Sequence, residues 1–477
     1  MVVLRLNNLP KRSSQTLITR SSLRFAMSFQ ATTRQIIEVL GATAHRVPDT
    51  VTGITTDSRS VKPGEVFLAL RGEKFDGHQF VQQSIDQGAV CAIVDSDFAN
   101  ADLPVIVVPD TLAAYQAIAH WWRQQFKIPI IAITGSVGKT TTKELLAAVL
   151  ARYGSVHKTQ ANYNNEIGVP KTLLELNSTH EFAVIEMGMR AAGEIALLSQ
   201  IASPDIAVIT NVGTAHIGRL GSRDAIASAK CELLAEMPQA SIAVLNHDNP
   251  LLLETAKSVW RGKTITYGLN GGDLHGEIID PHTVRVEGTK FQLPIPGEHI
   301  ALNFLAALAV ARELNLDWSH LRSGFEVQLP SGRSQRYELP NDIVILDETY
   351  NAGLESMLAS LKLLAQTPAK RRIAVLGTMK ELGDWSIESH HQVGEQVKRL
   401  KLDRLLILAD PDEAIAMQRG AAPLVTELFA DQAHVVERLK QIVQPGDRVL
   451  FKASRAVGLD RVVDQFRLEL ETSAIHS

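Results

Sequence analysis

Short apolar runs alternate with amphipathic stretches along most of the chain. In the run at 128–134, β-branched residues predict a buried strand, and Pro129 lies near its start, where a strand tolerates proline. The apolar residues that follow recur at helical spacing: Leu145, Leu146, Val149, Leu150 and Tyr153. We therefore predict a strand followed by a helix, with Gly154 placed to end that helix as its C′ residue.

The alternation continues toward the C-terminus. Short strands that end in polar residues are predicted within 182–188 and 205–216, and small antiparallel strands within 262–300. A helix is predicted to begin within PGEHIALNFLAALAVARELN. Four more strands are predicted near the end of the chain: 343–347, 372–377, 404–410 and 448–454. Strands that alternate with helices are typical of a mostly parallel sheet covered on both faces, so the predicted fold class is α/β.

Changes in this pattern divide the chain into three predicted α/β domains. Residues 27–125 combine short strands, helices and turns in a small N-terminal domain. Residues 126–336 form the central parallel-sheet domain, which the polar, turn-rich stretch PSGRSQR closes. Residues 337–477 form a C-terminal domain that is Rossmann-like in its alternation of strands and helices. Gly-x-Gly-x-x-Gly is absent after its first strand, so a dinucleotide is not indicated.

Residues 1–26 differ from the rest in composition. They contain serines and basic residues but no acidic residue, which is typical of an organelle transit peptide. The basic residues are Arg5, Lys11, Arg12, Arg20 and Arg24. An alternative, which we favour, is a start codon placed too early, with Met27 as the real beginning. An ordinary domain pattern starts directly after Met27, and this supports the alternative.

Composition and charge narrow the class of protein. The chain has 477 residues, of which 45% are hydrophobic. No uninterrupted apolar stretch approaches the ~20 residues that a membrane-spanning helix needs. The net charge of −4 lacks the basic excess of a nucleic-acid-binding protein. Cys91 and Cys231 give no disulfide framework or metal-site spacing, so we predict two ordinary buried cysteines in a reducing compartment.

The clearest chemical signal is the glycine-rich loop that follows the strand predicted at 128–134. Its residues are Gly135, Ser136, Val137, Gly138, Lys139, Thr140 and Thr141. A strand, a glycine loop, Lys-Thr and a helix form a phosphate-binding loop, whose backbone N–H groups and helix dipole face the phosphates. Lys139 is predicted to reach the terminal phosphates, and the Thr140 hydroxyl to ligate magnesium. The usual pattern has a glycine where this chain has Ile133, so a plain strand–helix turn is the alternative.

Three more side chains are candidates for nucleotide chemistry. Glu186 and His216 follow predicted strands, and ligands of parallel sheets collect at the carboxyl ends of strands. Glu186 could ligate magnesium or orient water, or could simply be solvated. Without further support, His216 is best interpreted as a hydrogen-bonded structural histidine, because histidine is an unusual magnesium ligand. Lys230 lies in the amphipathic stretch SRDAIASAKCELLAEM, and composition alone predicts a surface lysine.

Two polar clusters complete the candidates. Thr56, Asp57, Ser58 and Arg59 combine hydroxyls, a carboxylate and a guanidinium. Such a group can hold a phosphorylated or sugar ligand, or can be an ordinary turn. In NYNNEIGVP, Asn162, Asn164 and Asn165 stand close together. Asparagines favour turns, and they also hydrogen-bond neutral ligands.

An ordered set of motifs resembles that of a known family. The motifs are TGSVGKTTTKE, NYNNEIGVP, EMG with a following GEI, NVGTAHIGRLGS, AKCELL, PGEHIALNFLAA, SGRSQR, DETYNA, VLGTMKELG and FKASR. The set resembles the Mur ligases, ATP-dependent amide-forming enzymes of peptidoglycan synthesis, over about residues 35–465. The order of so many motifs is far more specific than any one of them. The resemblance therefore implies a central ATPase domain between two flanking domains.

Within this family the chain is most similar to the ligases that join D-alanyl-D-alanine to UDP-N-acetylmuramoyl-tripeptide. The ligase that adds the third residue usually has a Thr-Asn-Gly-Lys-Thr loop and an Asp-Asn-Pro-Arg motif, and this chain has neither. The resemblance implies that ATP phosphorylates the tripeptide carboxylate to an acyl phosphate, which the dipeptide amine attacks. A folylpolyglutamate synthase is an alternative. Residues 53–80 resemble the uridine-binding site of the Mur ligases, and this resemblance argues against the folate enzyme. A phosphate-loop switch protein would leave the flanking domains unexplained.

The resemblance also implies roles for single residues. The catalytic set is Lys139, Glu186, His216 and Lys230. Magnesium is expected on Thr140, Glu186, His216 and Lys230, and Lys230 matches a lysine that is carbamylated in several relatives. The nucleotide is expected to contact Asn303, Arg333 and Asp347 besides the phosphate loop.

Substrate contacts follow from the same resemblance. The uridine diphosphate sugar is expected at Thr55, Asp57, Ser58 and Arg59, and further substrate contacts at Asn162, Asn164 and Asn165. Tyr350, Asn351, Lys452 and Arg455 are expected near the incoming dipeptide or the nucleotide. The expected protein is a cytoplasmic monomer that uses ATP and Mg²⁺ on small-molecule substrates, binds no nucleic acid and spans no membrane.

Overall fold

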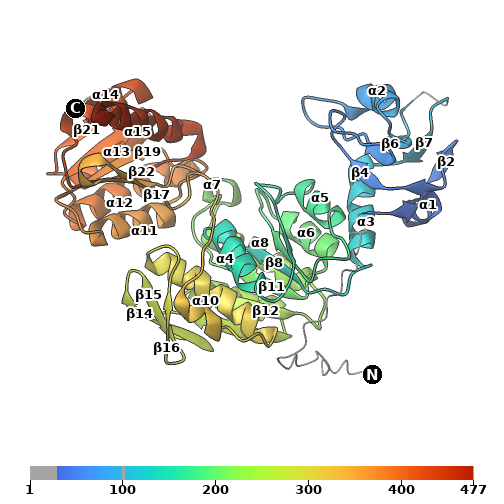
Figure 1. Ribbon diagram of the computed structural model, residues 1–477, viewed down its shortest axis with the longest axis horizontal. Helices are drawn as coiled ribbons and strands as arrows, with labels where there is room; N and C mark the ends of the chain where they lie inside the picture. Colours follow the sequence, from blue (N-terminus) through green and yellow to red (C-terminus); the bar gives the residue numbers. More distant parts are fainter. Residues whose placement is uncertain (1–28, 99–101, 476–477) are drawn as a thin grey trace.

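The computed structural model describes residues 29–98 and 102–475, so the expected leader at 1–26 lies outside the described residues. The elements form three α/β units, each on a main sheet of its own (Figure 1). This confirms the predicted fold class. The N-terminal unit (blue) and the C-terminal unit (orange to red) lie at opposite ends of the central unit. The division at 125/126 and 336/337 stays a prediction, and β17 (Gln335–Leu339) crosses the second point.

The N-terminal unit has a five-stranded sheet in the order β2-β7-β6-β5-β4, in which β2 alone runs antiparallel to its neighbour. Its elements are β1 (Ala31–Thr32), α1 (Thr33–Leu40), β2 (Thr43–His45), β3 (Thr50–Val51), β4 (Gly53–Thr55), β5 (Glu65–Leu68), η1 (Gly77–Phe80), α2 (Val81–Asp86), β6 (Cys91–Asp95), β7 (Val105–Val108) and α3 (Thr111–Arg123). Val66 and Leu68 pack on one face of the sheet and Phe67 on the other. Both faces are therefore buried.

The central unit is built on a nine-stranded sheet, β16-β15-β14-β13-β12-β11-β8-β10-β9. Its elements up to α8 are β8 (Ile130–Thr134), α4 (Lys139–Leu150), β9 (Val156–Lys158), α5 (Gly168–Leu174), β10 (Phe182–Glu186), α6 (Glu194–Ala202), β11 (Ile206–Ile209), α7 (Ile217–Leu220) and α8 (Arg223–Glu236). The rest are β12 (Ile242–Asn246), α9 (Pro250–Val259), β13 (Lys263–Gly268), β14 (Leu274–Asp280), β15 (Thr283–Val286), β16 (Thr289–Gln292), α10 (Glu298–Glu313) and η2 (Ser319–Ser323). The predicted strands at 128–134, 182–188 and 205–216 are confirmed.

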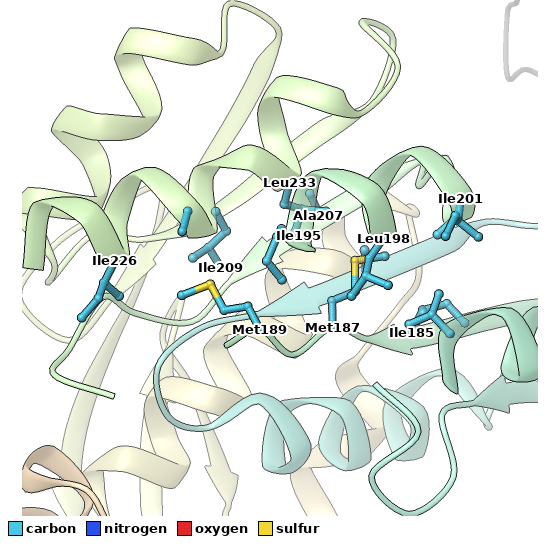
Figure 2. Packing of buried hydrophobic residues seen from close by; sticks show 14 of the residues in the cluster. Ile185, Met187, Met189, Ile195, Leu198, Ile201, Ala207, Ile209, Ile226 and Leu233 are labelled. Carbon is cyan, nitrogen blue, oxygen red and sulfur yellow. The ribbon is translucent and has the colours of Figure 1, made fainter. Parts of the chain in front are cut away.

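Helices cover both faces of this sheet, which explains the apolar runs of its strands. Ile131 and Ile133 of β8 face the layer of α4 and α10, whereas Ile130 and Ala132 face the opposite layer. Figure 2 shows the second layer, where side chains of β10 and β11 meet those of α6 and α8. The labelled residues are Ile185, Met187, Met189, Ile195, Leu198, Ile201, Ala207, Ile209, Ile226 and Leu233. Each large side chain buried in this way contributes about 1.5–3 kcal/mol.

The C-terminal unit has a six-stranded sheet in the order β17-β18-β22-β19-β20-β21, parallel except for β17. Its remaining elements are η3 (Pro340–Asp342), β18 (Ile343–Asp347), α11 (Leu354–Gln366), β19 (Arg371–Gly377), η4 (Gly383–Trp385), α12 (Ser386–Arg399), β20 (Arg404–Leu408), α13 (Pro411–Ala421), β21 (Thr426–Leu428), α14 (Gln432–Ile442), β22 (Asp447–Lys452), η5 (Arg455–Val457) and α15 (Leu459–Ile475). All four strands predicted here are confirmed. Cys91 and Cys231 are buried and unpaired, as predicted.

One local prediction was wrong, and another was confirmed only in part. Helix α4 ends at Leu150, before Gly154, and Gly154 has no positive φ. A Cβ at Gly154 would lie 1.8 Å from Glu181 Oε2, so close approach rather than helix capping accounts for this glycine. Within 262–300, the predicted antiparallel pairing is confirmed for β14, β15 and β16, whereas β13 pairs parallel with both β12 and β14. Across the described part of the chain, no helix combines the length and apolarity needed to cross a membrane.

Candidate active site

The glycine loop lies between β8 and α4, as predicted. Gly138 has a left-handed φ of 84°, and a Cβ there would lie 2.6 Å from Asn303 Oδ1 on α10. Glycine is therefore required by both conformation and space. Lys139 Nζ donates to the carbonyl of Gly135 at 2.7 Å, and burial lowers its pKa. The loop thus carries its lysine folded over its own backbone, with Thr140 and Thr141 buried in the first turn of α4.

The segment after β11 supports this loop. Asn211 accepts from Val137 N through Oδ1 at 3.0 Å and from Ser136 N through its carbonyl at 3.1 Å. Gly213 N in turn donates to Ser136 Oγ at 2.9 Å. Asn211 was missed in the sequence, where its place in the NVGTAH motif at a strand end was the available signal.

Glu186 ends β10 and is only 3% exposed, so a solvated side chain is ruled out. Asn164 Nδ2 donates to its Oε1 at 2.8 Å, and Lys143 Nζ lies 3.7 Å from its Oε2. Oε2 is buried and accepts no hydrogen bond from the described residues. Lys143 was also missed, because a lysine early in a helix gives no local signal of burial. The arrangement leaves one carboxylate oxygen available for a cation.

His216 precedes α7 in a left-handed conformation with φ 67°. Its Nδ1 lies 2.6 Å from Glu381 Oε2 of the C-terminal unit, without the alignment of a hydrogen bond. Burial lowers the pKa of His216, Glu381 opposes this shift, and the nearby charges of Lys139 and Lys230 add to it. The positive charges of Lys139 and Lys230 therefore both act on the side chain of His216.

The position of Lys230 contradicts the prediction, made from composition alone, that it is a surface lysine. Lys230 is 1% exposed and lies on α8, four residues after Ile226 and four before Leu234, which both pack into the core. Spacing of four residues places all three on one helical face, a signal that the sequence offered. The structure gives its Nζ neither a hydrogen bond nor an ion pair with any described residue. Burial, together with the charge of Lys139, holds the pKa of Lys230 well below its usual range.

A magnesium ion fits the residues around the loop. Over the described residues, no group of three or more His, Cys, Asp and Glu could hold a metal alone. Magnesium is usually held by one or two carboxylates together with substrate phosphates, so a complete protein cage is not needed. The Oε2 of Glu186, which accepts no hydrogen bond from the described residues, is an oxygen donor of the required kind. The Thr140 hydroxyl beside the phosphate loop is a second oxygen donor.

The C-terminal unit adds a second group of predicted residues. The Arg333 guanidinium lies 3.9 Å above the ring of Tyr350, and its Nε is buried without a hydrogen bond from the described residues. Asp347 is buried at the end of β18, and burial raises its pKa although Thr349 donates to it. Arg333 also lies close enough to Lys139 to lower the pKa of that lysine. The charge of Arg333 therefore acts on the lysine of the phosphate loop.

Lys452 is buried at the end of β22, where its Nζ donates to the carbonyl of Asn351 at 3.2 Å and lies 3.8 Å from Glu348. Burial lowers the pKa of Lys452. Arg455 is exposed and lies 3.3 Å from Asp460. Lys452 and Asn351 are therefore in direct contact, while Arg455 faces solvent.

The predicted sugar site lies in the N-terminal unit, after β4. Arg59 donates twice to Asp57, at 2.8 Å each, and this pairing lowers the pKa of Asp57 to about 2. Thr55 Oγ1 accepts from Asp57 N at 3.2 Å, and Ser58 is half-buried beside them. The charge of Lys171 on α5 also lowers the pKa of Asp57, by less than Arg59 does.

The three asparagines have different surroundings. Asn164 holds Glu186, as described above. Asn165 Oδ1 accepts from Gly168 N at 2.9 Å and so serves the start of α5. Asn162 is exposed. The structure therefore brings only Asn164 to the group around Glu186.

Three Mur ligase domain families match successive parts of the chain. The Mur ligase family catalytic domain matches residues 50–123, the Mur ligase middle domain 133–311, and the glutamate ligase domain of Mur ligases 332–455. These ranges correspond in order to the three sheet-based units.

Two curated relatives share one name. UDP-N-acetylmuramoyl-tripeptide–D-alanyl-D-alanine ligase of Synechocystis sp. is 57% identical over 89% of this chain and 93% of its own length. The protein of that name from Escherichia coli is 34% identical over 91% and 97%.

Solved structures agree with these matches. A crystal structure of MurF from Acinetobacter baumannii has a TM-score of 0.85 and 32% identity, covering 93% of this chain and all of that one. MurF ligase from Thermotoga maritima in complex with ADP has a TM-score of 0.79 and 32% identity, with coverages of 88% and 98%. The extent and identity of these matches establish that the chain belongs to the Mur ligase family.

Proposed function

We propose that the chain is an ADP-forming, ATP-dependent ligase that joins D-alanyl-D-alanine to UDP-N-acetylmuramoyl-tripeptide. The observation that carries the proposal is the match, over nearly the whole length of both chains, to relatives named for this reaction. The local geometry agrees with it, since the buried carboxylate of Glu186 ends the strand that pairs with β8, and β8 leads into the glycine loop with Lys139. A ligase of this class needs both features for phosphoryl transfer.

The chemistry explains why ATP is used. A free carboxylate is a poor acyl donor, because oxide is a very poor leaving group. Transfer of the terminal phosphoryl group gives an acyl phosphate and ADP. The dipeptide amine then attacks the acyl carbon, the C–O bond to phosphate breaks, and the amine loses a proton as the amide forms. Each step moves negative charge on phosphate oxygens, which fixed positive groups stabilise.

The phosphate loop supplies these groups in the proposal. Its backbone N–H groups and the N-terminus of α4 bind the phosphates. Lys139, which donates to the carbonyl of Gly135, would turn from it to the terminal phosphate. Asn303 packs against Gly138 and fixes the loop on the nucleoside side. Arg333, stacked on Tyr350, contributes further positive charge, and Asp347 is proposed near the nucleoside.

Magnesium is part of the same proposal. Thr140, Glu186, His216 and Lys230 are the residues proposed to hold it. The ion, when bound, would add positive charge to the phosphate oxygens. Asn164 and Lys143 keep the Glu186 carboxylate in place. Asn164 contacts its Oε1 and Lys143 its Oε2.

The substrates are proposed to reach the loop from the two flanking units. Asp57 and Arg59, with Thr55 and Ser58, would bind the uridine diphosphate sugar, and Asn162 and Asn165 are proposed to contact the tripeptide. The guanidinium of Arg59 is exposed, so it can contact a diphosphate. Closure of the units would exclude water from the acyl phosphate, which water would otherwise hydrolyse.

The dipeptide is proposed to bind beside the C-terminal unit. Lys452, Asn351 and Tyr350 would line its place, with Arg455 at the exposed edge. We also propose a cytoplasmic monomer. One chain contains all of the proposed site residues, and two buried, unpaired cysteines suit a reducing compartment.

ADP release tests the proposal directly. ADP should form rapidly only when the UDP-muramoyl-tripeptide and D-alanyl-D-alanine are both present. Glutamate with a folate acceptor, and a diamino acid with the UDP-muramoyl-dipeptide, are the controls for other ligases. Equal ATP turnover with no acceptor would overturn the ligase and favour a phosphate-loop switch protein.

A further inference from the structure

One segment joins the phosphate loop to the C-terminal unit. We define this linking loop as residues 210–219, from the end of β11 into α7. Near its start, Asn211 bonds the backbone of the phosphate loop through two acceptors. Thr210 Oγ1 adds a bond to the carbonyl of Val137 at 2.6 Å. The start of the linking loop is therefore fixed to the nucleotide side of the site.

Its later part is held by the C-terminal unit. Thr214 donates to both carboxylate oxygens of Glu355 on α11, from N at 2.7 Å and from Oγ1 at 3.1 Å. Gly218 N donates to the carbonyl of Glu381 at 3.1 Å. A Cβ on Gly218 would lie 2.5 Å from Gly383 N, so the two backbones are in direct contact. Figure 1 shows α7 beside the C-terminal unit.

His216 lies between these two attachments. Glu381 Oε2 is 2.6 Å from His216 Nδ1, and Glu381 Oε1 is 3.4 Å from Arg219 Nη2. Both His216 and Glu381 have left-handed backbone conformations, with φ of 67° and 66°. Such conformations are strained in residues other than glycine and persist where the surroundings hold them. A chance contact of two surface side chains would not require them.

We propose that Glu381 is a positioning residue for His216, so that contact with the C-terminal unit sets the place of His216 beside the phosphate loop. With Nδ1 next to the carboxylate, Nε2 is the ring nitrogen left for a ligand. Histidines at metal sites are commonly oriented by a carboxylate in this way. Here the orienting carboxylate comes from a different unit, so the metal site and the position of the C-terminal unit become coupled. The inference rests on the proposed function.

Metal binding without turnover is the first test. Mn²⁺ is titrated by electron paramagnetic resonance against the full chain with a non-hydrolysable ATP analogue. Glu381→Ala should weaken Mn²⁺ binding about 10- to 100-fold, the usual effect of removing an orienting partner. Glu381→Gln keeps an acceptor oxygen and should bind closer to wild type. Asp384→Asn removes an exposed carboxylate from the same turn and is the matched control, with expected wild-type affinity.

Steady-state kinetics separate positioning from general damage. Glu381→Ala should raise the magnesium concentration for half-maximal rate while the KM for UDP-muramoyl-tripeptide and the melting temperature stay unchanged. Wild-type Mn²⁺ affinity in Glu381→Ala, or an equal loss in Asp384→Asn, would overturn the inference. If the wild-type chain itself binds no Mn²⁺ with the nucleotide analogue, the proposed function fails, and the inference fails with it.

Discussion

Replacement of Lys230 by methionine distinguishes a chemical role from a structural one. Lys230 is 1% exposed, and no described residue pairs with its amine. Burial of a polar group without a partner costs about 1–3 kcal/mol in protein mutational data. Methionine has a similar length and no charge. In bicarbonate-free buffer, Lys230→Met should therefore raise the free energy of unfolding by up to that amount.

A second buried lysine provides the matched control. Lys143 is also 1% exposed, but its Nζ donates to the carbonyl of Thr159 at 2.8 Å and lies 3.1 Å from Glu144 Oε1. Its removal would leave the buried carboxylate of Glu186 without its cation, which costs about 3–5 kcal/mol, whereas Glu144 would keep its ion pair with Lys158. Lys143→Met should thus lower stability strongly, while Lys230→Met does not. Chemical denaturation of both variants and the wild type measures the difference.

Activity should respond in the opposite way. The lowered pKa of Lys230 favours its neutral amine, the form that adds to carbon dioxide and, on losing a proton, becomes a carbamate. A carbamate has a negative charge and two oxygens, the hard ligands that magnesium prefers. Loss of such a group should reduce turnover about 10²- to 10³-fold, as for other electrostatic contacts to a transition state. Lys230→Ala should regain part of the rate when a short-chain carboxylic acid occupies the vacated space.

Three results would refute this reasoning. Wild-type turnover in Lys230→Met would exclude the carbamate. A stability loss as large as that of Lys143→Met would show that the amine has a partner and that its burial is structural. Failure of carboxylic acids to restore Lys230→Ala, with its fold intact, would also contradict the proposed charge.

Three further variants test other parts of the site. Lys139→Ala should lose about 3–4 kcal/mol of transition-state stabilisation with an unchanged melting temperature, and a rate above about a tenth of wild type would contradict its role. Arg59→Ala should raise the KM for UDP-muramoyl-tripeptide at constant kcat, with little change in stability because the Asp57 pair is exposed. An unchanged KM would remove Arg59 from the sugar site. Gly138→Ala should weaken ADP binding in calorimetry, since its Cβ would meet Asn303 at 2.6 Å; unchanged affinity would contradict this packing.

The buried strands could be predicted because each leaves a continuous apolar run. β18, β19, β20 and β22 have helices on both faces, and their interiors contain hardly a polar residue. β9 and β21 have only three residues each, too few for any period to show. Gly154 was misassigned because the sequence cannot distinguish a glycine that relieves crowding by a distant side chain from one that ends a helix.

The phosphate loop was also predictable, since all its parts are contiguous in the chain. The environment of single charged residues was not. Lys230 was assigned to the surface because of its charge, although its spacing from Ile226 and Leu234 put it on the buried face. Lys143 and Asn211 act through contacts with other strands, which no local pattern contains.

The linking loop shows why the site depends on more than its predicted residues. Its start is bonded to the phosphate loop and its later part to Glu355, 141 residues away from Thr214 in sequence. A displacement of the C-terminal unit must therefore break these bonds or carry the loop, and His216 with it. Contacts of this kind have few discrete arrangements, because packed backbones such as Gly218 and Gly383 leave no room for gradual change. The position of the C-terminal unit thus influences the phosphate side of the site even where it contributes no ligand of its own.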